Sequence, residues 1–142
     1  MFDRISELKH IREQKSKLSE RESELTRPFL TDLSLIATLF LWFNELQADR
    51  ICSPRVDSVI QRKKFIFIVL YLFSPSTLAG GKIANGLRIV LAEILGFKSP
   101  TAISNLCIDV AFLYSNYKDY RESVDSLYSE IFKRLKIKGI IK

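Results

Sequence analysis

Hydrophobic side chains recur along the chain at the three- and four-residue spacing of helices, and this pattern predicts a helical fold. The apolar windows are rich in Leu, Ile and Phe, lack the strict alternation of half-buried strands, and are separated by Pro and Gly residues. We therefore expect an all-α protein with a single helical domain of about five to six helices. Its predicted parts are a charged N-terminal helix (1–27), a helical domain (28–136) and a basic tail (137–142) that is partly disordered.

The first predicted helix covers residues 3–26, a highly charged run without Pro or Gly. Its apolar side chains are Leu8, Ile11, Leu18 and Leu25. With Leu8 at heptad position a the other three fall at d, but Lys15 and Glu22 also occupy a, so half of a coiled-coil seam is missing. The run is predicted to be either a solvated surface helix or a weak coiled coil that depends on a partner.

Two apolar helices are predicted next. The Arg27-Pro28 pair ends the first helix, because the residue before proline is disfavoured in the α region. The helix from 29 to 48 is apolar around nearly its whole circumference, so we expect it at the centre of the core or half-covered by another copy of the chain. The segment from 55 to 73 begins basic and ends apolar; it also suits a buried strand, but its length favours a helix. Neither apolar window approaches the roughly 20 residues of a membrane span.

Residues 74–85 contain a Gly-Gly pair followed by Lys82. They lack the spacing and the preceding strand of a phosphate-binding P-loop, so they are predicted to be a surface loop. A helix over 84–96 follows, and a last helix is predicted over 117–136, where apolar residues again recur at helical spacing.

Residues that favour a helix end, a turn and a helix start lie between the helices predicted over 84–96 and 117–136. Gly96 is expected to end the helix that precedes it in the left-handed conformation. Ser99 has the place of an N-cap and Pro100 that of a first helical residue, so a new helix begins there and continues to Tyr114. Residues 84–114 are therefore predicted to form a helix-turn-helix, although such units also occur in small helical proteins purely for packing.

The formal net charge of +6 is unevenly distributed. Residues 1–50 hold 8 Lys/Arg and 9 Asp/Glu, a net of −1, whereas residues 51–142 hold 14 and 7, a net of +7. The basic part contains the predicted helix-turn-helix and is therefore expected to attract polyanions, although excess lysine also serves solubility alone.

No catalytic or metal-binding motif accompanies these patterns. The single histidine, His10, lies in the charged N-terminal run, and Cys52 and Cys107 lack the spacing of a zinc site. We expect no enzyme activity, no cofactor and no metal. The cysteines are expected to be buried in a reducing compartment, and because no apolar signal segment follows Met1, the expected location is the cytoplasm.

Residues 91–106, LAEILGFKSPTAISNL, resemble the helix-turn-helix of the C-terminal DNA-binding domain of the bacterial replication initiator DnaA. The aliphatic anchor Ile103 comes one residue later after Gly96 than in repressor-type motifs, and the initiator's motif carries the same extra turn residue. Lys98 corresponds to its turn arginine. The resemblance covers residues 55–136, but Ser99-Pro100 replaces the family's Asp-His pair and no Walker motif is present. It therefore implies a DNA-binding module without the initiator's ATPase or its target sequence.

This resemblance implies double-stranded DNA as the partner. The candidate DNA-binding residues are Arg62, Lys63, Lys64, Arg88, Lys98, Ser99, Thr101, Ser104 and Asn105. The cations are expected at phosphates and the neutral residues at base edges. We expect a non-enzymatic protein with a regulatory or replication-accessory role, of the kind found in phages or mobile elements. The alternative is a helical interaction protein that binds no nucleic acid and forms homo-oligomers, or binds a helical partner, through residues 3–48.

Overall fold

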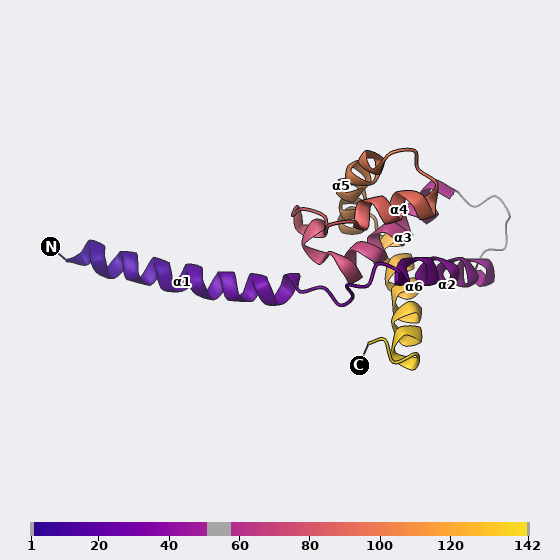
Figure 1. Cartoon of the computed structure of the whole chain (residues 1–142). Coiled ribbons are helices and arrows are strands. Elements are labelled where there is room, and N and C mark those ends of the chain that lie inside the picture. The colour runs from indigo at the N-terminus through magenta and orange to yellow at the C-terminus, as the bar shows by residue number, and fades with distance from the viewer. Residues whose placement is uncertain (1, 51–57, 142) are drawn as a thin grey trace.

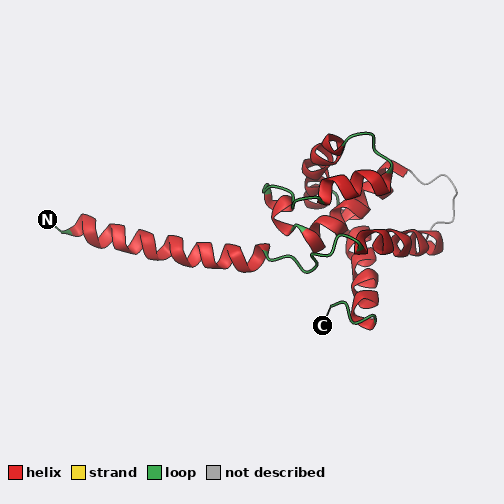
Figure 2. Cartoon of the chain, viewed as in Figure 1, coloured by secondary structure: helices red, strands yellow, loops and turns green. Residues whose placement is uncertain are grey.

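The structure is a computed structural model that describes residues 2–50 and 58–141. Over these residues the chain forms six α-helices and one 3-10 helix and no strand, so the predicted all-α class is confirmed. The elements are α1 (Asp3–Thr26), α2 (Leu35–Arg50), α3 (Ser58–Phe73), η1 (Pro75–Ala79), α4 (Leu87–Leu95), α5 (Pro100–Asn116) and α6 (Lys118–Ile137). Figure 1 shows α2 to α6 gathered into one body from which α1 projects as a rod, and Figure 2 shows the loops that join them.

Helix α3 forms the centre of the core. Every residue from Phe65 to Phe73 is buried except Tyr71, and α3 packs against α2, α4, α5, α6 and η1. A helix covered on all sides needs no polar face, which explains its unbroken apolar sequence. The predicted start of this helix, Arg55, lies outside the described residues.

Helix α2 begins at Leu35 and not near Phe29 as predicted. The backbone N–H groups of Phe29 and the next residue instead donate to the carbonyl oxygen of Leu72, at 2.9 and 3.0 Å, at the end of α3. The Asp32 carboxylate then accepts the Ser34 hydroxyl at 2.7 Å and the Ser34 N–H at 3.1 Å. These two hydrogen bonds lower the pKa of Asp32 and form the turn from which α2 starts.

The apolar circumference of α2 is covered on one side. Ile36, Leu39 and Phe43 are buried in the core, whereas Leu41 is 58% exposed and Phe40 is half-buried. The helix thus lies at the edge of the core and not at its centre. The expectation of a central helix is thus wrong, and cover by another copy of the chain stays a prediction.

The loop predicted over 74–85 contains the short helix η1, and the helix predicted from 84 begins at Leu87. Gly86 has a φ of 79°, which a continuing right-handed helix does not allow. The hydroxyl groups of Ser74 and Thr77 are buried and lie 2.7 Å apart, and they hold the loop against the end of α3.

The described residues of the basic tail predicted over 137–142 form the cap of α6. Gly139 has a φ of 74°, its N–H donates to the Lys136 carbonyl at 3.0 Å, and the N–H of Ile140 donates to the Leu135 carbonyl at 3.0 Å. These are the two bonds of a Schellman motif. Beyond them Ile141 is half-buried against the core.

Two further sequence predictions concern the cysteines and the membrane. Cys107 is buried and unpaired, while Cys52 lies outside the described residues. Among the described helices, none combines the length and the hydropathy that crossing a bilayer requires.

Candidate nucleic-acid interface

The turn between α4 and α5 is a second Schellman motif. Gly96 has a φ of 77°, its N–H donates to the Glu93 carbonyl at 3.3 Å, and the N–H of Phe97 donates to the Ala92 carbonyl at 2.9 Å. Phe97 is half-buried against the core, as the residue after the glycine usually is in this motif. The local sequence thus fixes where α4 ends and the direction in which the chain leaves it.

Helix α5 starts at the predicted position. Ser99 is extended and its hydroxyl oxygen accepts the Thr101 N–H at 3.2 Å, while Pro100 takes the first helical position. The helix continues to Asn116, two residues beyond the predicted end at Tyr114. Helices α4 and α5 with this turn, residues 87–116, are called the α4–α5 unit below.

One face of α5 is open to solvent. Thr101 and Asn105 are exposed one turn apart, and Ile108 and Phe112 continue the same face with 79% and 55% exposure. Ile103 and Val110, in contrast, are buried against the core. Of the residues predicted at base edges, Thr101 and Asn105 thus lie on the open face, beside two apolar side chains that the sequence did not single out, while Ser104 is half-buried.

Two of the predicted site residues meet across the α4–α5 unit. The Arg88 guanidinium, near the start of α4, donates to the Ser104 hydroxyl at 3.0 Å. Burial raises the pKa of the nearby Cys107 thiol, and the positive charge of Arg88 opposes part of that rise. Arg88 is exposed, so most of its donors remain turned to solvent while Ser104 holds it in place.

The three consecutive cations of α3 point in different directions. The Arg62 guanidinium lies 5.4 Å from the centre of the Phe97 ring and so reaches the turn. The Lys63 ammonium forms an ion pair with Asp109 of α5 at 2.6 Å, with only 19% of its side chain exposed. Lys64 lies in a hollow at the junction of α5 and α6. Arg62 alone of the three therefore lies beside the turn, and the phosphate contacts expected of these cations stay a prediction.

A groove of about 440 Å³ adjoins the unit on the side of Arg88. Its walls include Lys82 and the two glycines that precede it, facing Arg88 and Ser104. A side chain at Gly81 would place its Cβ 2.9 Å from the Ser76 carbonyl oxygen, so glycine permits this close approach. The segment is the predicted surface loop, and its position beside Arg88 depends on tertiary packing that leaves no local signal in the sequence.

Comparisons of the chain with protein-family models, with curated proteins and with solved structures give no match. Within the described part of the chain, no three His, Cys, Asp or Glu side chains come together in a way that would hold a metal ion.

Proposed function

We propose that the protein binds double-stranded DNA through the exposed face of α5. The proposal rests on one observation. Thr101 and Asn105 project from α5, and cations lie beside α5 at both ends of the neighbouring helix α4. Lys98 and Arg62 lie at the glycine turn, and Arg88 lies at the opposite end. A helix presented in this way beside cations matches what entry into a major groove requires.

The cations lie on the elements around α5 and not on α5 itself. Helix α5 contains no Lys or Arg, and Asp109 is its one charged residue. The Lys63 ammonium neutralises that carboxylate at 2.6 Å, which lowers the repulsion that a phosphate backbone would otherwise meet. In this proposal the surrounding cations supply affinity through phosphate contacts, and the neutral side chains of α5 supply preference among bases.

The predicted polar residues have different parts in this proposal. The Asn105 amide can form paired hydrogen bonds with an adenine edge, and Thr101 can bond a base or contact a thymine methyl group. The oxygens of Ser99 and Ser104 accept hydrogen bonds from Thr101 and Arg88 respectively. We therefore assign these two serines to positioning. The resemblance to the initiator's domain favours a regulatory or replication-accessory role for the binding.

A salt series measures the phosphate contacts. Binding of the full chain to a fluorescent duplex is followed by anisotropy at several salt concentrations. The double variant Arg88→Gln/Lys98→Gln is expected to bind more weakly. Its slope of log affinity against log salt should be shallower by about 0.9 for each phosphate that the variant no longer neutralises.

The matched control is Lys133→Gln. This exposed lysine lies in α6, outside the α4–α5 unit, and the variant removes one positive charge where the double variant removes two. Its slope should equal that of the wild type. Absence of binding at low salt, or equal slopes for the double variant and the wild type, would contradict the proposal.

Self-association through α1 is a second candidate function. The apolar residues Leu8, Ile11, Leu18 and Leu25 are 55%, 42%, 68% and 61% exposed, and no residue of α1 is buried. A parallel pair of α1 helices would place Lys15 against Lys15 and Glu22 against Glu22 at the a positions. An antiparallel pair sets a against d and removes both like-charge contacts, so it is the arrangement we favour.

Sedimentation equilibrium of the full chain tests this association. Leu18→Glu should shift the chain toward monomer, because it adds a charge at a d position in the middle part of the helix. Ser16→Glu adds the same charge outside the seam and should leave the association unchanged. A wild-type chain that stays monomeric at all concentrations would exclude association through α1.

A further inference from the structure

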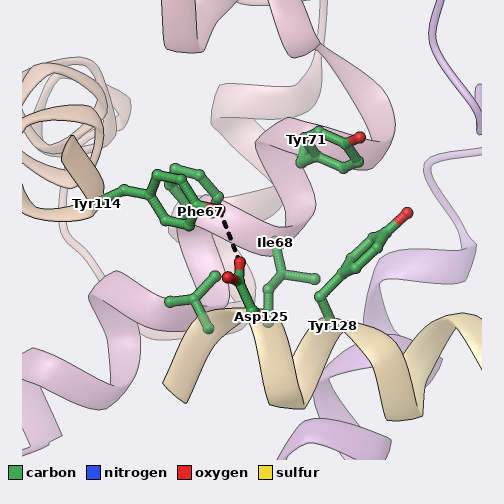
Figure 3. Close-up of a pocket in the computed structure, with 7 residues that line it drawn as sticks. Phe67, Ile68, Tyr71, Tyr114, Asp125 and Tyr128 are labelled. Carbon is green, nitrogen blue, oxygen red and sulfur yellow. Dashed lines mark hydrogen bonds between the residues drawn. The ribbon is translucent and has the colours of Figure 1, made fainter. Parts of the chain in front are cut away.

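A pocket with aromatic walls lies between α3, α5 and α6, away from the interface described above. Its volume is about 190 Å³. Figure 3 shows Tyr114 and Phe67 on one side, Tyr71 and Tyr128 on the other, and the Asp125 carboxylate between them. The pocket thus combines four aromatic rings with one acidic group.

The contacts between these residues hold the walls in place. The rings of Phe67 and Tyr114 are stacked with centroids 4.4 Å apart, and the rings of Tyr71 and Tyr128 meet edge-on at 5.1 Å. The Tyr114 hydroxyl donates to Asp125 at 2.7 Å, as the dashed line in Figure 3 shows. Tyr71 is 39% exposed, so one wall borders the solvent through which a ligand would enter.

The electrostatics of the pocket favour a cation. Aromatic faces carry negative potential, and a carboxylate beside them adds a full negative charge. The hydrogen bond to Asp125 raises the pKa of Tyr114, and burial together with Tyr71 raises the pKa of Tyr128 to about 12. Both phenols are therefore neutral at physiological pH, and the carboxylate is the one anionic group in the pocket wall.

Two neighbouring cations of the chain contact other groups and do not occupy the pocket. The Arg121 guanidinium, one turn before Asp125, donates to the backbone carbonyls of Tyr114 and Ser115. The Lys136 ammonium lies 4.9 Å from the centre of the Phe132 ring, which itself contacts Tyr128. The second contact shows that this aromatic cluster already accommodates an ammonium group at its far end.

We propose that this pocket binds an alkylated ammonium group, either of a free small molecule or of a methylated lysine side chain. A primary ammonium has three N–H donors that each need an acceptor, and the aromatic walls offer few. Methylation removes donors and adds apolar surface while the positive charge remains. The walls and the single carboxylate suit that combination better than a plain lysine.

Calorimetric or NMR titrations with choline and with its uncharged isostere 3,3-dimethylbutan-1-ol test the proposal. Choline should bind at least about fivefold more tightly than the isostere, because only the cation gains from the ring faces and from Asp125. Asp125→Asn keeps a hydrogen-bond acceptor for Tyr114 but loses the charge. It should weaken choline binding severalfold and leave binding of the isostere unchanged.

Variants of single tyrosines test whether choline binds in the pocket or elsewhere on the surface. Tyr71→Leu should weaken choline binding, whereas Tyr117→Leu, a matched change at a 54%-exposed tyrosine outside the pocket, should not. Titration with a trimethyllysine peptide and with its unmodified counterpart shows whether the ligand is a methylated lysine side chain or a free small molecule. Equal binding of choline and the isostere, or binding of neither choline nor the trimethyllysine peptide, would overturn the proposal.

Discussion

Replacing Gly96 by Ala tests the turn on which the orientation of α5 depends. No heavy atom lies within 4 Å of the position that a Cβ would take at Gly96, so the cost is backbone strain at a φ of 77° and not a collision. A left-handed residue with a Cβ costs about 1–2 kcal/mol. Loss of chain entropy in the unfolded state offsets about 0.4–1 kcal/mol of that. We therefore expect the free energy of unfolding to fall by about 1 kcal/mol.

Urea unfolding followed by far-UV circular dichroism measures this change, and a thermal melt should show a Tm lower by about 3–4 °C. Gly139→Ala is the matched control, because Gly139 has a φ of 74° and equally open space. Ile140, the residue after Gly139, is exposed, whereas Phe97, the residue after Gly96, packs against the core. The backbone at Gly139 can therefore relax more easily, and its substitution should cost less.

Gly96→Asn provides the converse test, because asparagine tolerates the left-handed region better than alanine does. It should restore part of the stability that Gly96→Ala loses. An unchanged free energy of unfolding for Gly96→Ala, or an equal loss for the asparagine and alanine variants, would refute a left-handed turn at this position.

Three further predictions follow from side-chain contacts. Tyr120→Phe removes a hydroxyl that donates to the Lys63 carbonyl at 2.8 Å from a side chain only 6% exposed, so urea unfolding should show a loss of about 1 kcal/mol. The pKa of Tyr128 is raised from 10 to about 12, so the stability that its neutral form contributes is complete below pH 10 and is lost as the pH rises toward 12. The Tm measured across this pH range should therefore fall less steeply for Tyr128→Phe than for the wild type. Asp109→Asn breaks the ion pair with Lys63 and should cost about 0.5–1 kcal/mol, while anisotropy at low salt should show tighter DNA binding because α5 loses its negative charge.

The features that sequence predicted well are encoded within a few neighbouring residues. Gly96, Ser99 and Pro100 have the conformations that their residue types favour, and the hydrogen bonds that cap the end of α4 and the start of α5 are made within the turn. Arg27 is extended before Pro28, as steric contact with the proline ring requires, and α1 ends there. Such positions are predictable because the energetic preference is local.

The features that sequence predicted poorly depend on distant partners. The start of α2 is displaced because the chain at Phe29 pairs with the carbonyl of Leu72, more than forty residues further on. The position of Lys82 beside Arg88 arises in the same way from packing of the loop against α5. The cap at Gly139 is a different case: a glycine after a basic helical turn is a local signal, and it was available in the sequence.

The basic triplet at 62–64 shows how helix geometry alters an electrostatic prediction. Successive residues on a helix are separated by about 100°, so three consecutive cations leave the helix in three different directions. Arg62 lies at the turn and Lys63 neutralises Asp109, so in the proposed complex the first adds a phosphate contact and the second removes a repulsion. Charge reversal at Arg62 should therefore change DNA affinity with little loss of stability. Reversal at Lys63 should lower both, because it leaves two facing carboxylates in a half-buried contact.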